Sequence, residues 1–372
     1  MHEFLIVGGG VVGLSIAYEL AGQGAREVVV IDAGEPGKEA SWAGAGIMPP
    51  GPPRPRTPLE QLLAMSNDLH PRWSAQLKAE TGLDNGYRPC EAIYLDRDAG
   101  SREPLASCIA GWREQGIRYR QLTARDVQRL EPQLKPPADK PAYVLPDEYQ
   151  IRNPWHLQAL VAGASKRGVK IVSHAAATGF KVSGDRIDTV ETEQGAYRAK
   201  CVCLTSGPWT AKLLDQLGIH VAIKPIRGQI ALLRTERPLL GRIVNEGRHY
   251  LVPRADGRLL VGSTEEDVGF DRTNTEDVID ELLAYARERV PAVAGLEPEK
   301  TWAGLRPHSA DGLPYVGRVG GIENLFVAAG HYRSGLQLSP ATAIVMSRLM
   351  RGLEPPVDLD EFRPDRHTAL AS

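Results

Sequence analysis

The sequence predicts an α/β protein in which a Rossmann-like domain is interleaved with an α+β domain built on a mixed, largely antiparallel sheet. Three observations predict this fold class. The chain opens with a strand, a helix and a second strand, and segments of this style return in the middle and near the end. The stretches between them are rich in short strands of alternating polarity. Because the two styles alternate, we expect the chain to cross between two domains several times.

The opening βαβ unit is the most regular segment. Residues 4–7 form an apolar run of strand length, residues 11–20 carry apolar side chains at helical spacing, and residues 28–31 form a second buried strand. This opening has no basic leading region and is interrupted by glycines, unlike a signal peptide or a membrane anchor. We therefore interpret it as part of the folded domain, and we expect a cytoplasmic protein without membrane partners.

The residues after this unit change in character. Residues 40–47 are small and rich in glycine, and six prolines follow between positions 49 and 58. So many fixed φ angles predict a stiff, extended loop. The apolar positions from Leu59 to Leu77 predict a helix, which Pro71 is expected to interrupt or restart.

Short strands dominate two later segments. The first is predicted to hold strands at 92–95, 118–122 and 143–145. The second is predicted to hold strands at 229–233, 250–252 and 259–261, followed by a helix near 275–289. These two segments form the expected α+β domain.

The strand-and-helix style returns between these segments and again at the end. The middle of the chain is predicted to hold a helix at 155–166 and strands at 169–172 and 201–204. Residues 325–328 then form a strand that leads through Gly330 into a helix, and Pro340 is expected to open that helix. These segments are expected to join the opening unit in one sheet.

The balance of charged residues indicates which kind of molecule the protein binds. The 372 residues carry 44 Lys and Arg against 46 Asp and Glu, a formal net charge of −2. Proteins dedicated to nucleic acids or membrane surfaces usually need a basic excess, so a small-molecule partner is expected. The four cysteines have no metal or redox spacing and are expected to be reduced thiols: Cys90, Cys108, Cys201 and Cys203.

A glycine-rich turn lies between the first strand and the first helix. Residues 8–13 read Gly-Gly-Gly-Val-Val-Gly, with Val11 and Val12 beginning the helix. Gly8 suits the tight turn, Gly10 lets a diphosphate approach the backbone, and Gly13 allows close packing of helix and strand.

An acidic residue completes this motif. Asp32, followed by Ala33, ends the second strand, where its carboxylate is suited to accept hydrogen bonds from ribose hydroxyls. A carboxylate disfavours the extra phosphate of NADP, so NAD and FAD both remain.

In six motifs the sequence resembles the D-amino-acid oxidase-like, FAD-dependent amine oxidoreductases, and most closely the glycine oxidases of thiamine biosynthesis. The motifs cover nearly the whole chain, at residues 4–15, 40–48, 204–209, 249–254, 304–307 and 329–336. The resemblance implies FAD rather than NAD. It also implies noncovalent FAD, because residues 300–306 contain no cysteine of the kind that attaches flavin in sarcosine-oxidase relatives.

The resemblance implies further flavin contacts beyond the glycine-rich turn. A second flavin loop is expected at Ser41, Trp42, Ala43, Gly44, Gly46 and Ile47. A second dinucleotide contact is expected at Ser206, Gly207 and Trp209. A loop beside the pyrimidine end of the flavin is expected at His331, Tyr332, Arg333, Ser334, Gly335 and Leu336, with Arg306 nearby. The FAD-binding domain would then comprise residues 1–84, 146–220 and 298–372, and the substrate domain residues 85–145 and 221–297.

The resemblance also implies the substrate-binding groups. Arg306 is expected to hold the substrate carboxylate, which a planar guanidinium suits because it can donate two parallel hydrogen bonds. Tyr250 is expected beside that carboxylate. Arg333 corresponds to a second basic group near the substrate, or it pairs with acids of the protein. His249 and His331 are candidate bases that the reaction does not need, and no metal site is expected.

The reaction implied is oxidative deamination of glycine or another small amino acid or amine, through an imine, with oxygen taking the electrons to give hydrogen peroxide. A homo-oligomer is possible. Three alternatives stay open: a dehydrogenase that passes electrons to a quinone or carrier, a tRNA-modifying FAD oxidoreductase, and a noncatalytic flavin-binding protein. The proline-rich stretch after Met48 departs from the family pattern beside the expected substrate pocket.

Overall fold

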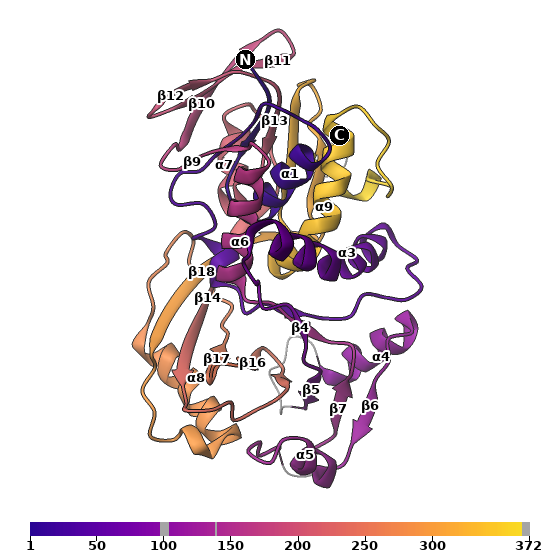
Figure 1. Ribbon diagram of the computed structural model, residues 1–372, viewed down its shortest axis with the longest axis vertical. Helices are drawn as coiled ribbons and strands as arrows, with labels where there is room; N and C mark the ends of the chain where they lie inside the picture. Colours follow the sequence, from indigo (N-terminus) through magenta and orange to yellow (C-terminus); the bar gives the residue numbers. More distant parts are fainter. Residues whose placement is uncertain (97–103, 138–139, 367–372) are drawn as a thin grey trace.

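One sheet of the protein is almost entirely parallel. The computed structural model describes residues 1–96, 104–137 and 140–366 (Figure 1). Six strands form this parallel sheet in the order β19-β20-β13-β1-β2-β9. Their bounds are β1 His2–Val7, β2 Val28–Ile31, β9 Lys170–Val172, β13 Ala199–Leu204, β19 Tyr315–Arg318 and β20 Leu325–Ala329. Only the β19–β20 pair is antiparallel, so the predicted Rossmann-like sheet is confirmed.

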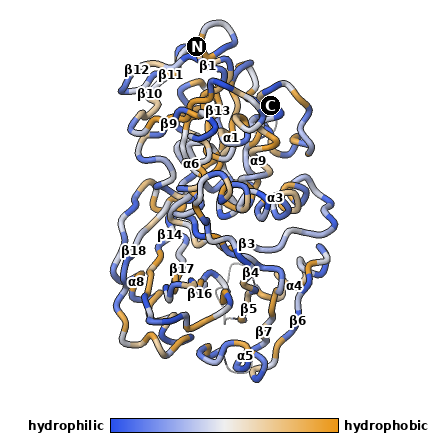
Figure 2. Tube along the Cα trace, viewed as in Figure 1, coloured by the Kyte–Doolittle hydropathy of each residue, from blue (hydrophilic) through white to orange (hydrophobic). Residues whose placement is uncertain are grey.

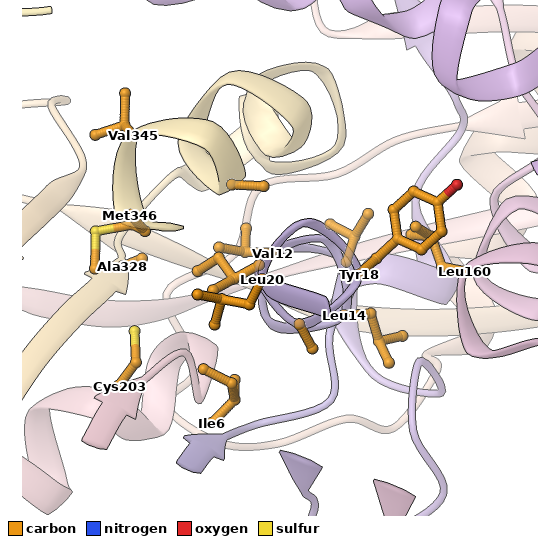
Figure 3. Packing of buried hydrophobic residues seen from close by; sticks show 14 of the residues in the cluster. Ile6, Val12, Leu14, Tyr18, Leu20, Leu160, Cys203, Ala328, Val345 and Met346 are labelled. Atoms are coloured by element: carbon orange, nitrogen blue, oxygen red, sulfur yellow. The ribbon is translucent and has the colours of Figure 1, made fainter. Parts of the chain in front are cut away.

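Four helices cover one face of the parallel sheet. They are α1 (Val11–Gly22), α3 (Pro58–Thr81), α6 (Asn153–Lys166) and α9 (Gly335–Met350). Their apolar side chains pack on the strand residues of that face, among them Ile6, Cys203 and Ala328 (Figure 3). Because alternate strand residues point to opposite faces, Leu5 and Val202 belong to a separate cluster on the other side.

The opposite face is covered by smaller elements. These are α7 (Thr210–Asp215) and a sheet of β10 (Ala177–Ser183), β11 (Arg186–Thr192) and β12 (Gly195–Tyr197). With both faces covered, the inner parts of these strands are apolar and buried and form the interior of this domain, whereas Lys170 of β9 and Lys200 of β13 are exposed (Figure 2).

The second large sheet is mostly antiparallel. Its eight strands lie in the order β18-β14-β17-β16-β15-β5-β7-β6, and only the β15–β5 pair is parallel. The strands are β5 Ala92–Leu95, β6 Arg120–Leu122, β7 Ala142–Leu145, β14 Ile223–Arg234, β15 Ile243–Glu246, β16 His249–Pro253, β17 Arg258–Gly262 and β18 Lys300–Ser309. The prediction of a mixed, largely antiparallel sheet is therefore confirmed.

Three helices accompany this antiparallel sheet: α4 (Leu105–Gln115), α5 (Ala124–Leu130) and α8 (Glu276–Arg289). The buried face of α8, including Leu282 and Ala286, packs on strand residues such as Val244 and Val261. The other face of the sheet is turned toward the parallel sheet and its helices (Figure 1).

The chain crosses between the two sheets several times, as the alternation of styles predicts. β18 is hydrogen-bonded along its whole length to β14, so it belongs to the antiparallel sheet, although the proposed domain boundary at residue 298 assigns it to the FAD-binding domain. We therefore move that proposed boundary to the end of β18. A small sheet of β3 (Ile47–Met48), β8 (Tyr149–Gln150) and β4 (Arg88–Pro89) joins segments from both proposed domains.

The predicted break at Pro71 is wrong, because α3 is continuous through it. Pro71 is exposed and removes one backbone donor, whereas Leu62, Trp73 and Leu77 of the same helix are buried in the core. The burial on both sides of the proline holds the two halves of the helix in line.

The predicted start of the last helix at Pro340 is also wrong, since α9 begins at Gly335. A proline inside a helix leaves the carbonyl four residues earlier without its backbone donor. Here the Ser339 hydroxyl donates to that carbonyl, on Leu336, at 2.9 Å. This replacement hydrogen bond lets the helix run through the proline.

Most other predicted elements agree with the structure to within two residues, but β14 begins at Ile223, six residues before the predicted start of that strand. The proline-rich segment between β3 and α3 has no helix or strand, as expected of a stiff loop. The short elements are α2 Ala40–Ala43 and the 3-10 turns Gly207–Trp209, Pro291–Val293, Tyr332–Ser334 and Asp360–Phe362. All four cysteines are free, and none of the helices in the described ranges is long and apolar enough to cross a membrane.

Candidate active site

A cavity of about 970 Å³ lies between the two sheets. It is lined at the carboxyl ends of the parallel strands by Val7, Ile31, Thr205 and Ala329, the edge at which open α/β sheets bind ligands. All of the predicted site residues except Gly13 and Trp42 line it: Gly8, Gly10, Val11, Val12, Asp32, Ala33, Ser41, Ala43, Gly44, Gly46, Ile47, Ser206, Gly207, Trp209, Tyr250, Arg306, His331, Tyr332, Arg333, Ser334, Gly335 and Leu336.

The glycine-rich turn directs the N-terminus of α1 at this cavity. Gly8 has φ of +115°, and a Cβ there would lie 2.6 Å from the carbonyl oxygen of Thr205. A Cβ on Gly13 would overlap the carbonyl oxygen of Gly8, so Gly13 serves packing rather than contact with a ligand. A Cβ on Gly10 would meet only the Ser41 hydroxyl, at 3.3 Å. The Val11 amide donates to the Ser41 hydroxyl at 2.9 Å, and the positive end of the helix dipole at this turn suits a diphosphate.

Asp32 is bonded to the turn as well as facing the cavity. Its Oδ2 accepts a hydrogen bond from the Gly9 amide at 2.6 Å, and its Oδ1 accepts one from the Gly34 amide at 2.8 Å. Burial raises the pKa of the Asp32 carboxyl, and these two amide hydrogen bonds oppose the rise. Each carboxylate oxygen keeps a lone pair for a further donor such as a ribose hydroxyl.

The loop at residues 40–47 is held by distant side chains. Asn153 donates to the carbonyl of Ser41 at 2.7 Å, and the Trp302 indole donates to the carbonyl of Ala43 at 3.0 Å. Arg254 donates to the carbonyl of Ala45 at 2.7 Å. Burial lowers the pKa of Arg254 to about 10, which leaves it charged at neutral pH.

Trp42 lies outside the cavity lining. Its ring meets that of Trp302 edge to face, with the centroids 5.3 Å apart. The ammonium of Lys300 lies 4.5 Å from its centroid. Its contacts therefore anchor the loop to β18.

Arg306 and Tyr250 come from different strands of the antiparallel sheet. The Arg306 guanidinium donates through Nη1 to the carbonyl of Thr264 at 2.9 Å and through Nη2 to the Ser263 hydroxyl at 2.7 Å. Two of its five N–H groups are thus used, which fixes its plane and leaves donors for a carboxylate. Tyr250 lies on β16 and lines the same cavity.

Arg333 is paired with an acid of the protein, one of the two alternatives that the sequence leaves open. Its guanidinium forms an ion pair with Glu265, whose side chain is only 11% exposed. The Tyr332 hydroxyl donates to the same carboxylate at 2.7 Å. This pairing makes Arg333 a weaker candidate than Arg306 for holding a substrate carboxylate.

The two histidines considered as bases are both buried. Burial lowers the pKa of His331 to about 4, and its Nε2 lies 3.2 Å from the Thr342 hydroxyl. The His249 ring stacks on Tyr285 of α8 with the centroids 4.8 Å apart. His331 is therefore neutral at physiological pH.

The far end of the cavity is bounded by α4 and the proline-rich loop. Leu105, Cys108, Gly111, Trp112 and Gln115 line it from one face of α4, since their spacing follows the helical repeat. Gln115 donates to Glu60 at 3.0 Å, which ties α4 to the start of α3. Pro49 of the loop also lines the cavity, and its carbonyl accepts a hydrogen bond from Gln337 of α9 at 2.9 Å.

Several residues of the site were not predicted from the sequence. Thr205 belongs to the turn expected from the resemblance to contact the dinucleotide, but its hydrogen bond to the carbonyl of Gly8 at 2.7 Å, which fixes the glycine-rich turn, was not foreseen. Arg254 lies inside a motif that carries the family resemblance, which is the signal that could have found it. Arg248, in the turn between β15 and β16, also lines the cavity, but it lies outside the six motifs. Within the described ranges, no group of three or more His, Cys, Asp and Glu residues could hold a metal ion.

Buried histidines predict acid sensitivity of the fold. Burial, together with the nearby His70, lowers the pKa of His156 from 6.5 to about 3. Between pH 6.5 and about 3, His156 is therefore protonated in the unfolded chain and neutral in the folded protein. The stability from this histidine is complete above pH 6.5 and falls by about 1.4 kcal/mol per pH unit as the pH is lowered toward 3.

The expected result is that His156→Asn flattens this dependence, because the amide does not titrate. Urea unfolding at pH 7 and pH 5 of parent and variant measures the difference. Equal losses of stability in the two proteins between these pH values would show that His156 is not the titrating group.

The comparisons with known proteins agree with this geometry. A family model described as "FAD dependent oxidoreductase" matches residues 3–349. The chain is 36% identical over 367 residues to the glycine oxidase of Pseudomonas putida, covering 98% of each protein. It is 32% identical over 372 aligned residues to the bifunctional protein ThiO/ThiG of a Synechocystis species, covering 98% of this chain and 54% of that protein.

A solved structure gives the same result for the fold. The crystal structure of glycine oxidase from Geobacillus kaustophilus superposes with a TM-score of 0.91 at 31% identity, covering 98% of this chain and 99% of that one. The family and the cofactor expected from the sequence are thereby confirmed. The chain belongs to the family of FAD-dependent oxidoreductases.

Proposed function

We propose that this protein oxidises glycine or another small amino acid or amine to an imine, which water hydrolyses, and that oxygen accepts the electrons. For glycine, the overall reaction consumes one O₂ and one water and yields glyoxylate, ammonia and hydrogen peroxide. One observation carries the proposal: Arg306 is fixed at the cavity by Ser263 and Thr264, beside Tyr250 and across from the glycine-rich turn.

The residues around the cavity fit FAD. The N-terminus of α1 and the loop at residues 40–47 would hold the diphosphate, and Asp32 the ribose. Gly335 and Leu336 at the start of α9, with the turn before them, would lie beside the flavin ring. Bound FAD supplies the two-electron oxidation of the substrate's Cα–N bond.

The protein's own groups position the substrate. A guanidinium held by two protein hydrogen bonds offers its remaining N–H groups to one carboxylate in a fixed plane. The Tyr250 hydroxyl is available as a further donor. Fixing the carboxylate at one end sets where the α-carbon and amine lie, and such positioning is the main contribution of the protein to this chemistry.

The names of the relatives and the free cysteines support two narrower proposals. The relative named ThiO/ThiG supports a role in thiamine biosynthesis. Four free thiols support a reducing compartment such as the cytoplasm.

The test is an aerobic assay of the holoenzyme with a panel of small amino acids and amines. Peroxide, ammonia and oxo-acid are measured together, and an artificial dye is offered in parallel. Equal yields of the three products support the proposed oxidase. Dye reduction without peroxide would identify a dehydrogenase, and salt-sensitive binding of tRNA would favour the RNA-modifying alternative.

The FAD is expected to be noncovalent. The purified protein should be yellow, and acid precipitation should release the flavin into the supernatant, because β18 carries no cysteine for attachment before Arg306. Absorbance of pellet and supernatant checks this. Flavin that stays with the washed pellet would contradict it.

A further inference from the structure

The Arg306 side chain crosses a neighbouring strand to reach its partners. Arg306 is on β18, and its partners Ser263 and Thr264 directly follow β17. Because the strands lie in the order β18-β14-β17-β16, the side chain must pass over β14. It does so at Gly228, where a Cβ would overlap the guanidinium carbon and both terminal nitrogens.

Tyr250 shows the same arrangement from the other side. It lies on β16 and is paired with Gly262 of β17. A Cβ on Gly262 would lie 2.5 Å from the ring carbon Cζ and 2.6 Å from the hydroxyl oxygen, closer than real Cβ atoms approach other atoms. Both side chains thus lie over glycines, and these glycines are on the two adjacent strands that separate β18 from β16.

A left-handed backbone does not explain these glycines. Neither Gly228 nor Gly262 has a φ in the left-handed region, so a positive φ is not what calls for glycine at either position. A glycine inside a strand weakens it, because glycine loses more backbone freedom on folding and packs no side chain. What both positions require is empty space above the strand.

We propose that Gly228 and Gly262 are positioning residues, whose missing side chains let Arg306 and Tyr250 converge on one substrate carboxylate. This inference rests on the proposed function. On this proposal, amines that carry a carboxylate are selected by the bare backbone of β14 and β17 as well as by the side chains of Arg306 and Tyr250, which lie over it.

Gly228→Ala tests the proposal most simply. The three atoms nearest to the added methyl group all belong to the far end of the flexible Arg306 side chain, so the guanidinium should shift while the fold and the bound FAD are retained. A displacement of about 1 Å can cost roughly 100-fold in a well-oriented site. We expect the dissociation constant of acetate, measured through the flavin absorbance of the holoenzyme, and the KM for amino acids to rise roughly 10- to 100-fold.

Two controls separate positioning from general damage. Gly295→Ala adds the same methyl group at an exposed glycine with no atom within 4 Å and should change neither quantity. In an Arg306→Ala background the obstruction is gone, so adding Gly228→Ala should cost nothing further. Gly262→Ala should likewise weaken acetate binding in the parent and have no effect in a Tyr250→Ala background.

The outcomes are distinguishable. If Arg306→Ala weakens acetate binding and Gly228→Ala does not, the positioning role is refuted and the proposed function stands. The same holds if the two substitutions are additive. If Arg306→Ala itself leaves acetate binding unchanged, the proposed anchor is wrong, and this inference is overturned with it.

Discussion

Arg306→Ala is expected to lower kcat/KM for amino acids by roughly 30- to 5,000-fold while FAD stays bound. Removing one partner of a buried, hydrogen-bonded charge pair typically costs about 2–5 kcal/mol, which corresponds to that range. FAD content should not change, because the guanidinium is bonded to Ser263 and Thr264 rather than to the elements around the glycine-rich turn. Steady-state kinetics with measured flavin content check both expectations.

Lysine should rescue this variant poorly, because a point charge cannot donate to the Thr264 carbonyl, the Ser263 hydroxyl and a carboxylate in one plane. An amine without a carboxylate, if the panel contains one that turns over, should be much less sensitive to the change. Parental kcat/KM in Arg306→Ala would place the anchor elsewhere. Arg248 would then be examined before Arg333, because Arg333 is paired with Glu265.

Asp32→Ala is expected to release FAD and also to destabilise the apoprotein. The carboxylate accepts hydrogen bonds from the amides of Gly9 and Gly34, 2.6 and 2.8 Å away, and each donor left unsatisfied costs about 1–3 kcal/mol. This revises the expectation from the sequence alone, in which Asp32 serves only the ribose. Flavin content after gel filtration and the urea midpoint of the apoprotein measure the two effects.

Asp32→Asn provides the matched control. Its amide oxygen can accept from one of the two backbone donors, but its NH₂ group would face the other, so only part of the apoprotein stability should return. Parental flavin content in Asp32→Ala would mean that the glycine-rich turn does not hold the cofactor.

The fold was predictable where the pattern is local. The apolar run, the glycines and the second strand of the βαβ unit lie within the first 31 residues, and the structure has β1, α1 and β2 there. Pro71 and Pro340 were misread because their tolerance depends on distant packing and on one hydroxyl, that of Ser339. Proline removes the same donor everywhere, and the surroundings decide whether the helix ends.

The sequence predicted most of the residues that line the cavity, but it did not predict the hydrogen bonds that hold them in place. Arg254 holds the carbonyl of Ala45 across 209 residues of sequence, and Asn153 holds that of Ser41 across 112. The periodicity of apolar residues along the sequence gives no information about such long-range hydrogen bonds. The need for Gly228 beneath Arg306 likewise becomes visible only when strand order and register place the two together.

The central claim is that an amino acid held by Arg306 reduces the bound flavin. Anaerobic mixing of the holoenzyme with glycine and other small amino acids, followed by flavin absorbance, tests this most directly. We expect the absorbance to bleach with at least one of these substrates, and to bleach at least 30-fold more slowly in Arg306→Ala at low substrate concentration. Flavin that no amine bleaches, or that bleaches equally fast in the variant, would contradict the account.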